Sequence, residues 1–174
     1  MARRINLREY QENVFARLRS VAAEGSTSLA KLGVLIGDRA CLVDMRDVSE
    51  VVPIPKMLEV PLVKKWFSGV ANVRGNLYGV TDVQAFIGQG KVNISNVSRL
   101  LLVHPRLMHN SALLVSGMMG LRYIDQMQAL PPRQDAPPWV LGDYQSNDGC
   151  QWQEISVGTL VQHAEYLKVG VYDL

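Results

Sequence analysis

Residues 66–88 read WFSGVANVRGNLYGVTDVQAFIG, and this stretch decides what fold the chain is expected to adopt. Two half-apolar runs flank Gly75 and Asn76, and such a step favours a tight turn with positive φ between two strands. Gly69 is a further candidate for a turn. The stretch therefore predicts a β-hairpin.

The end of the same stretch predicts a short helix. Asp82 follows the second apolar run, where its carboxylate can accept hydrogen bonds from the first backbone N–H groups of a helix. Gly88 suits the position just past the last helical residue. We therefore expect Asp82 to cap a helical turn over residues 83–87, with a catalytic acid as the alternative role for this aspartate.

Arg74 lies next to the predicted turn. A guanidinium group is strongly hydrated and is seldom found in a protein core without a partner. Arg74 is therefore a candidate contact for a binding partner.

The composition is typical of a globular protein with one domain or two closely linked subdomains, since 48% of the 174 residues are hydrophobic and 20% are charged. The net charge of +2 is too small to predict binding to nucleic acid or to an anionic membrane. Cys41 and Cys150 form no disulfide framework, which favours a reducing compartment. We find no secretory signal and no segment of membrane-spanning length, so we expect a cytoplasmic protein without direct membrane insertion.

The first 27 residues predict a helix followed by a linker. Asn6 and Glu9 have the spacing of a capping box. The apolar positions recur at helical spacing, at Leu7, Tyr10, Val14, Leu18 and Val21. This helix can either dock its apolar stripe on the domain or bind a partner or a membrane surface.

From residue 32 onward the pattern is that of short strands broken by turns. Strands are expected over residues 32–36, 40–45, 48–52, 99–103, 111–115, 121–124, 139–141 and 150–155. Turns are expected at residues 37–38, 117–120 and 147–149, and the prolines of residues 131–138 predict an extended loop. Short strands without intervening long helices favour a mainly β protein, a small barrel or a sandwich, over a parallel sheet.

Within the strand over residues 48–52, alternation places Val48, Glu50 and Val52 on one face. An acid between two valines has two interpretations. The face is either exposed to solvent, or it is a patch where a partner covers the valines and pairs with the acid.

Near the end of the chain, Ser156 is expected to cap a helix that Gly170 ends. Its apolar face is predicted to consist of Val157, Leu160, Val161, Ala164 and Leu167. The expected organisation is thus a helix and linker over residues 1–27, a domain over residues 28–169 and a tail over residues 170–174.

The sequence shows no pattern typical of catalysis or of metal binding. His104 and His109 match no metal-ligand spacing, and Cys41 and Cys150 are expected to be small apolar residues. Phosphate-binding loops and nucleophile elbows are lacking too. We therefore predict a binding module without catalytic residues, metal or cofactor. A nucleic-acid-binding β-barrel and a hydrolase or transferase that uses Asp82 with a histidine are the alternatives.

The opening stretch also resembles the signature of the CheW-like adaptor family. The matching positions are Trp66, Gly69, Val70, Asn72, Arg74, Gly75, Asp82 and Gly88, with Val48 to Glu50 matching an upstream strand. The chain departs from the signature at Val73, Gly79 and Thr81, where the family usually has leucine, proline and an apolar residue. The likeness covers residues 29–167, and the wording GVANVRG is most similar to members from pilus chemosensory systems.

This resemblance implies two small five-stranded β-barrels around a shared apolar groove, without catalytic activity or cofactor. Family members couple the cytoplasmic tip of a methyl-accepting chemoreceptor to the regulatory domain of a CheA-type histidine kinase. The resemblance implies a cytoplasmic protein recruited to receptor arrays at the inner membrane. The expected output is type IV pilus twitching motility, with flagellar chemotaxis as the alternative.

The resemblance also assigns roles to individual residues. Glu50 and Arg74 match an acid and an arginine implicated in receptor and kinase coupling, and Val48 matches a receptor contact. Gly69 and Val70 join them as candidate partner-binding residues, whereas Trp66, Gly75, Asp82 and Gly88 form the structural motif. The alternative is that Glu50 and Arg74 pair with each other inside the protein.

Overall fold

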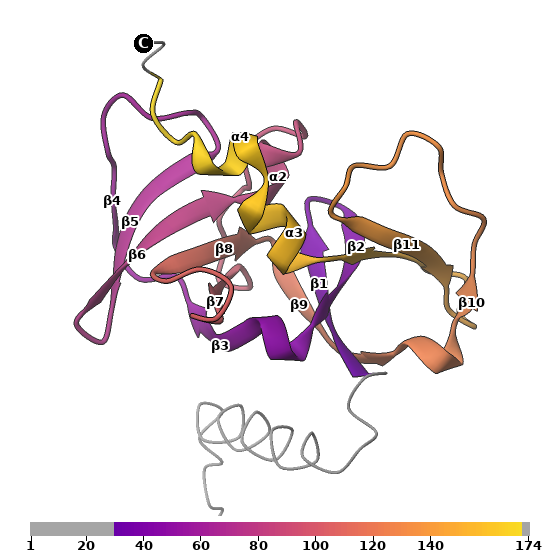
Figure 1. Ribbon diagram of the computed structural model, residues 1–174. Helices are drawn as coiled ribbons and strands as arrows, with labels where there is room; N and C mark the ends of the chain where they lie inside the picture. The colour runs from indigo at the N-terminus through magenta and orange to yellow at the C-terminus, as the bar shows by residue number, and fades with distance from the viewer. Residues whose placement is uncertain (1–29, 172–174) are drawn as a thin grey trace, which may run out of the picture.

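The computed structural model describes residues 30–171, which form many strands and a few short helices (Figure 1). The strands are β1 (Ala30–Ile36), β2 (Arg39–Asp44), β3 (Val48–Pro53), β4 (Met57–Leu58), β5 (Phe67–Val73), β6 (Asn76–Asp82), β7 (Arg99–Val103), β8 (Ser111–Val115), β9 (Gly117–Tyr123), β10 (Gln128–Ala129), β11 (Val140–Gln145) and β12 (Gln151–Ile155). The helices are α2 (Val83–Phe86), α3 (Val157–Gln162) and α4 (Ala164–Leu167), with 3-10 turns η1 (Met45–Asp47) and η2 (Ile124–Gln126). The helix predicted within residues 1–27 lies outside the described residues.

The strands form two six-stranded sheets, which confirms the mainly β class. Sheet A has the order β10-β11-β12-β2-β1-β9, and sheet B has the order β3-β7-β8-β6-β5-β4. Each sheet has one strand more than the five expected, because the two-residue strands β4 and β10 pair at the edges. Pairing is antiparallel except between β12 and β2 and between β6 and β8, so each sheet holds one parallel pair that the sequence pattern did not predict.

Three apolar clusters stabilise this arrangement. The largest lies between the sheets, where side chains such as Val34 of β1 and Leu113 of β8 meet Leu160 of α3. The second, on the other face of sheet B, holds residues of both edge strands, Val52 of β3 and Met57 of β4. The ion pair of 2.6 Å between Glu50 of β3 and Arg74 of the β5–β6 turn spans β7 and β8, which lie between β3 and β6 in the sheet, so sheet B curves into a barrel-like shape. A third cluster around Trp152 lies on the other face of sheet A.

The hairpin predicted from residues 66–88 is present as β5 and β6, with its turn one residue earlier than expected. Val73 pairs with Asn76, so the loop consists of Arg74 and Gly75, whose φ values are 52° and 88°. Positive φ at both loop residues defines the turn whose twist matches that of a hairpin. Asn72 helps to hold it, because its Oδ1 accepts a hydrogen bond of 2.8 Å from the backbone N–H of Gly75. The turn expected at Gly69 is wrong, because Gly69 lies within β5 at a register shift.

The structure also corrects the turn expected at residues 117–120. This segment belongs to β9, which pairs with β1 of sheet A and not with β8. The chain leaves sheet B at Ser116, whose backbone N–H donates to Leu35 O over 2.8 Å. Met118 and Met119 then pack against different clusters, as alternation along a strand requires. Gly120, with a φ of 77°, accommodates the register shift in this pairing.

The helix predicted after Ser156 is present but shorter than expected. Ser156 caps α3 by accepting from Thr159 N over 3.2 Å. The helix then ends at Gln162, because His163 is extended and its Nδ1 accepts from Glu165 N at the start of α4. The break rotates α4, so that Tyr166 is buried and Leu167, expected on the apolar face, is exposed.

The predicted shared face of Val48, Glu50 and Val52 is wrong for Val48. The pairing of β3 with β7 shifts register between Val48 and Glu50, which is a β-bulge. Val48 consequently packs in the cluster between the sheets, whereas Val52 packs in the cluster on the other face. Glu50 lies opposite Leu102, a member of that second cluster, and so shares the face of Val52.

Candidate functional site

The candidate site is built around an ion pair between Glu50 and Arg74. Arg74 Nη1 donates to Glu50 Oε2 over 2.7 Å, and Nη2 donates to Oε1 over 2.6 Å. This bidentate geometry is the strong form of the arginine–carboxylate interaction. The side chains remain 66% and 35% exposed, respectively. Arg74 therefore pairs inside the protein and still presents its guanidinium group to solvent.

Two local features bring these residues together. Arg74 is the first residue of the β5–β6 turn, whose left-handed backbone sets the direction of its side chain. Glu50 follows the bulge in β3, an edge strand of sheet B. Ser49, within the bulge, donates from Oγ to Leu102 O over 3.1 Å. The ion pair thus links the tip of a hairpin to the edge of the sheet.

The outer face of the hairpin that carries Arg74 is apolar. Val70 of β5 pairs in register with Leu58 of β4 and Gly79 of β6, while Leu77 lies opposite Asn72. Leu58 and Leu77 are exposed, and Val70 is half-buried. Alternation places these side chains on the face opposite the second cluster. The hairpin whose turn carries Arg74 therefore has an apolar outer face.

Two of the candidate partner-binding residues are buried. Val48 belongs to the core between the sheets, so the structure does not present it at the surface. Gly69 has a φ of 118°, and a Cβ atom there would lie 2.1 Å from Leu58 O. Gly69 therefore permits the close approach of β4 to β5.

The motif residues Trp66 and Asp82 hold the base of the hairpin. Trp66 is buried, stacks on Tyr166 at 5.8 Å and meets Phe86 edge-on at 5.2 Å. Asp82 Oδ1 accepts from Ala85 N over 3.0 Å, which confirms the predicted helix cap. Asp82 Oδ2 accepts from Val92 N over 2.8 Å. Both carboxylate oxygens of this buried aspartate thus accept backbone hydrogen bonds that stabilise the local structure.

Gly88 also has the predicted position, following α2 with a φ of 79° and donating from N to Ala85 O.

Burial raises the pKa of the Cys41 thiol to about 12, so this cysteine is not a thiolate nucleophile at neutral pH. Within residues 30–171, no group of three or more His, Cys, Asp or Glu side chains could hold a metal ion. None of the helices in that part of the chain is long and apolar enough to cross a membrane.

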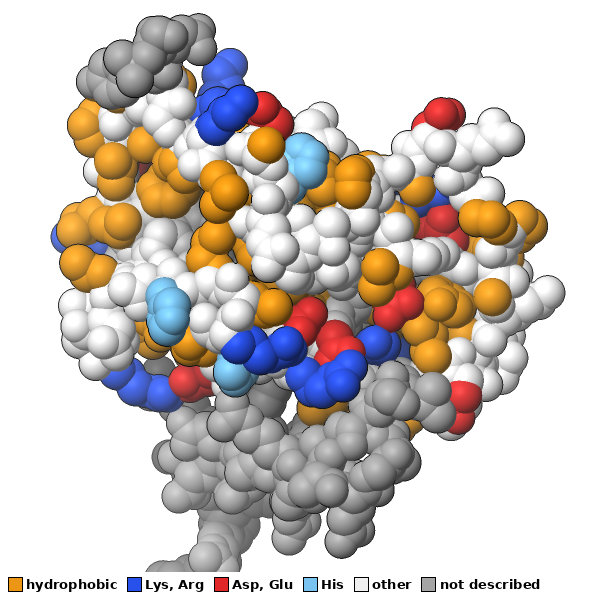
Figure 2. Space-filling model, viewed as in Figure 1, with side chains coloured by type: hydrophobic (Ala, Val, Ile, Leu, Met, Phe, Trp, Pro, Cys, Tyr) orange, Lys and Arg blue, Asp and Glu red, His pale blue; other side chains and the backbone are white. Residues whose placement is uncertain are grey.

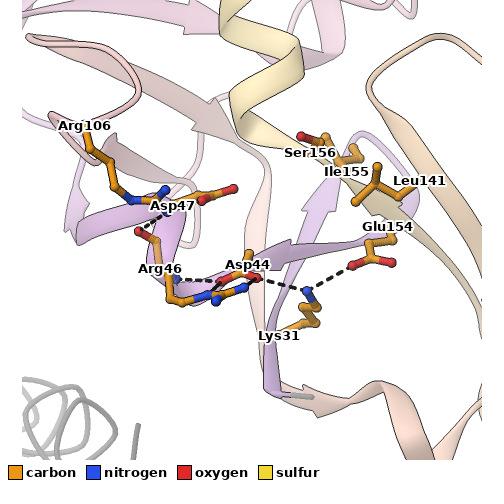
Figure 3. A pocket seen from close by; sticks show the side chains of 9 residues that line it. All are labelled: Lys31, Asp44, Arg46, Asp47, Arg106, Leu141, Glu154, Ile155 and Ser156. Carbon is orange, nitrogen blue, oxygen red and sulfur yellow. Dashed lines mark hydrogen bonds and ion pairs between the residues drawn. The ribbon is translucent and has the colours of Figure 1, made fainter. Parts of the chain in front are cut away.

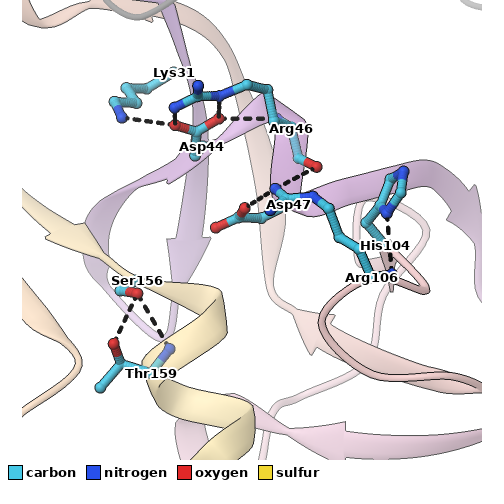
Figure 4. A network of polar contacts seen from close by, with 8 residues as sticks. All are labelled: Lys31, Asp44, Arg46, Asp47, His104, Arg106, Ser156 and Thr159. Carbon is cyan, nitrogen blue, oxygen red and sulfur yellow. Dashed lines mark hydrogen bonds and ion pairs between the residues drawn. The ribbon is translucent and has the colours of Figure 1, made fainter.

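Sequence patterns missed a polar network where the two sheets join (Figure 4). Arg46 of η1 donates from Nε and Nη2 to the Asp44 carboxylate over 3.0 and 2.8 Å. Lys31 of β1 donates to Asp44 Oδ2 over 3.1 Å and forms an ion pair of 3.0 Å with Glu154 of β12. Arg106, in the β7–β8 loop, donates to Arg46 O over 2.9 Å and also pairs with Asp47. These charges are scattered along the sequence and form no motif.

The network determines the charge states of Asp44 and Lys31. Burial disfavours the charged form of Asp44, but hydrogen bonds from Arg46 and Lys31 outweigh it and hold the pKa of this carboxyl well below its ordinary value. Burial likewise opposes the charge of Lys31, and the Glu154 and Asp44 carboxylates raise its pKa overall. Both groups are therefore charged across the physiological range.

The two-sheet fold and the signature hairpin define the class of protein: the chain belongs to the CheW-like domain family, whose model matches residues 31–165. The resemblance stated from the sequence is thereby confirmed. The chain is 31% identical over 152 residues to the protein PilI of Pseudomonas aeruginosa, an alignment that covers 85% of this chain and 84% of PilI. It is also similar in structure to the scaffolding protein CheW of Thermoanaerobacter tengcongensis, with a TM-score of 0.65 and 21% identity over 78% of this chain and 89% of that one. That second likeness supports the fold alone.

Proposed function

We propose that this protein is a non-catalytic scaffold that couples a chemoreceptor to a CheA-type histidine kinase. Its partners are the cytoplasmic tip of a methyl-accepting receptor and the regulatory domain of the kinase. It acts in the cytoplasm, recruited to receptor arrays at the inner membrane. Membership of the CheW-like family and the likeness to PilI support this proposal, and PilI favours type IV pilus twitching motility as the output.

The observation that carries the proposal is the exposed Glu50–Arg74 pair, whose arginine lies at the tip of a hairpin with an apolar outer face. An ion pair in water contributes little, but a partner that excludes water strengthens it and can add acceptors to the exposed guanidinium group. Val70, with the exposed Leu58 and Leu77 beside it, supplies an apolar surface for the same partner. The combination of a charged anchor and an apolar surface is typical of protein interfaces.

The proposed mechanism is a contact among three proteins. Because the core cluster fills the space between the two sheets, a helical hairpin of the receptor packs its apolar residues against the outer face of the β5–β6 hairpin. The kinase domain abuts another face of the same scaffold. A change in the receptor then alters kinase activity through this shared contact, without any chemistry in the scaffold itself.

The decisive variant is Arg74→Glu, tested by co-purification of kinase and receptor with the tagged protein. We expect capture to be lost, because the partner would meet two carboxylates where it binds a guanidinium group. The free energy of unfolding, measured by thermal denaturation, should change by no more than about 1 kcal/mol, since the ion pair is exposed. A large loss of stability, with capture retained by the fraction that stays folded, would contradict the proposal.

The reversed pair Glu50→Arg with Arg74→Glu separates the two roles of Arg74. If the partner reads the guanidinium group at the hairpin tip, restoring the internal pair should not restore capture. Full recovery would show that the pair only holds the hairpin in place. Arg133→Glu is the matched control, because Arg133 is also exposed and forms a bidentate pair with Asp143, over 2.7 and 3.2 Å. We expect this control to retain capture.

The pathway output needs a separate experiment. Deleting the gene should abolish twitching and leave swimming unchanged. The opposite result would assign the scaffold to flagellar chemotaxis.

A further inference from the structure

A second surface feature lies where the sheets join, apart from the hairpin. A pocket with a volume of about 330 Å³ opens there, lined by Lys31, Asp44, Arg46, Asp47, Arg106 and Glu154 (Figure 3). Figure 2 shows basic and acidic side chains gathered between the two sheets on this face. The lining residues come mainly from sheet A, from η1, the turn that connects the two sheets, and from the β7–β8 loop.

The positive and negative charges of the pocket are equal in number, but the cationic side chains are more exposed than the anionic ones. Its three cationic and three anionic side chains cancel in net charge. Arg46 and Arg106 are 63% and 50% exposed, whereas their partners Asp44 and Asp47 are only 17% and 16% exposed. The carboxylates therefore lie beneath the guanidinium groups, and solvent meets mainly N–H donors.

The guanidinium groups of Arg46 and Arg106 are held in place by hydrogen bonds, and each has further N–H groups that can donate to a ligand. Arg46 uses Nε and Nη2 to bind Asp44, and Arg106 uses Nη2 to bind Asp47 and the backbone of Arg46. A guanidinium group carries further N–H groups, and no other bond to them is found within residues 30–171. Fixed donors of this kind bind an incoming carboxylate with little additional loss of side-chain freedom.

An exposed leucine completes the surface. Leu141 lines the same pocket and is 61% exposed. It lies at the register shift between Val140 and Gly142, where β11 departs from regular pairing with β12. Bulges of this kind redirect a side chain, and an exposed apolar residue beside oriented cations is typical of a contact surface.

We propose that Arg46, Arg106 and Leu141 form a docking surface for a protein segment in which carboxylate side chains flank an apolar side chain. The guanidinium groups bind the carboxylates, and Leu141 packs against the apolar residue. This surface uses none of the residues of the Glu50–Arg74 site, so it stands independently of the proposed function.

The balanced charge is what selects this class of ligand. A neutral cluster produces little long-range field, so a polyanion such as nucleic acid gains little from it. Binding must come from short-range hydrogen bonds together with apolar contact. A free anion would engage the guanidinium groups and leave Leu141 uncovered, whereas an acidic segment with an apolar residue uses both.

The probe for this proposal is a labelled peptide, Ser-Glu-Glu-Leu-Asp-Glu-Ser, titrated with the full-length protein and followed by fluorescence anisotropy. A second peptide with lysine in place of every acid is its control. We expect the acidic peptide to bind at least about tenfold more tightly than the basic one, because carboxylates accept from the exposed guanidinium N–H groups and ammonium groups cannot. Equal binding of the two peptides would overturn the proposal.

Leu141→Asp tests the apolar part, because it leaves every bond of the network in place. We expect about tenfold weaker binding of the acidic peptide, from lost apolar contact and added repulsion. Val97→Asp is the matched control, since Val97 is 59% exposed and lies in a loop before β7. An equal effect of both variants would contradict the proposal.

Nuclear magnetic resonance then locates the contact. The Nε–H signals of Arg46 and Arg106 should shift with the acidic peptide, and free glutamate at the same concentration should shift them much less. Equal shifts with glutamate would mean that the surface takes a small anion and not a protein segment. Arg106→Lys, which keeps the charge but loses the planar fork, should weaken peptide binding while the protein stays folded.

Discussion

Two residues of the β5–β6 hairpin have left-handed backbones for different reasons. Arg74 adopts a φ of 52° because a hairpin loop of this type needs it. Gly69 adopts a φ of 118° inside a strand, where the carbonyl oxygen of Leu58 occupies the space of a side chain. The first residue can be any that tolerates positive φ, but the second must be glycine.

Gly69→Ala is therefore expected to destabilise the protein by about 2–5 kcal/mol, from backbone strain and steric overlap together. The overlap involves backbone atoms of β4, which cannot move away as a flexible side chain would. Urea unfolding followed by tryptophan fluorescence measures the change. Gly75→Ala is the control, because Gly75 also has positive φ but no atom within 4 Å of the added Cβ. Gly75→Ala should lower the free energy of unfolding by only about 1 kcal/mol. An equal loss of stability in the two variants would refute the steric explanation.

Residues whose role is local could be predicted from the sequence. Asp82 and Ser156 cap helices as expected, and the β1–β2 turn begins at Gly37 as expected. The exposed position of Arg74 was also predicted, together with its pairing to Glu50 as an alternative. The position of Val48 could not be predicted, because a bulge results from pairing with β7 and not from any property of Ser49 itself.

At the level of elements, α2 and the loop after it depend on one carboxylate. Asp82 joins the end of β6 to the first turn of α2 and to Val92, a buried residue in the middle of the following loop. Residues 89–98 contain no helix or strand, so this bond is a main tether of the segment. One side chain thus orders the connection from β6 to β7.

Replacing Asp82 by alanine should cost about 2–4 kcal/mol. The lost cap accounts for about 1 kcal/mol, and the buried Val92 N–H left without an acceptor accounts for about 1–3 kcal/mol. Amide hydrogen exchange should accelerate over residues 83–98 before it does elsewhere. Ser156→Ala removes a cap that accepts only from Thr159 N and should cost about 1 kcal/mol. If both variants lose the same stability, the tethering role is wrong.

Two elements show where local patterns fail. The apolar spacing after Ser156 predicts one continuous helix, but packing turns the chain at His163 so that Tyr166 reaches Ser111, with 2.8 Å between the hydroxyl oxygens. Glycines at residues 117 and 120 indicate a turn, but β1 offers an unpaired edge that β9 fills. In both cases a contact distant in sequence outweighs local preference.

In the whole molecule, sheet A is assembled from both ends of the described chain and sheet B from its middle. The chain crosses between them at η1 and at Ser116, and both crossings are hydrogen-bonded to the other sheet. Ser116 Oγ accepts from Gly37 N over 2.9 Å, and Asp47 O at the end of η1 accepts from His104 N over 2.8 Å. The sheets are therefore fixed relative to each other by polar bonds as well as by the shared core.

The polar network where the two sheets join could not be predicted from the sequence. Lys31, Asp44 and Glu154 come from three strands, and only the parallel pairing of β12 with β2 brings the last of them close. The family resemblance gave no help, because its motif lies in sheet B. Hydrophobic periodicity locates strands well, but it does not locate charges that meet only after the strands have paired.

Asp44 should make the stability of this joint depend on pH in the acid range. Its folded pKa lies below its unfolded value, so its stabilising effect is fully present above the unfolded pKa, near pH 4, and is lost progressively as the pH falls below it. Asp44→Asn should cost about 2–4 kcal/mol at neutral pH, because Lys31 and Arg46 lose a shared carboxylate. The difference from the wild type should shrink steadily below about pH 4, as protonation removes the same charge from the wild type.

Urea unfolding at a series of pH values from neutral to about pH 2.5 measures this difference directly. Asp135→Asn is the control, because Asp135 is an exposed aspartate in the proline-rich loop. This variant should follow the wild type throughout. A deficit in Asp44→Asn that stays constant as the pH falls would mean that the carboxylate acts through packing alone, and that its charge does not hold η1 between the sheets.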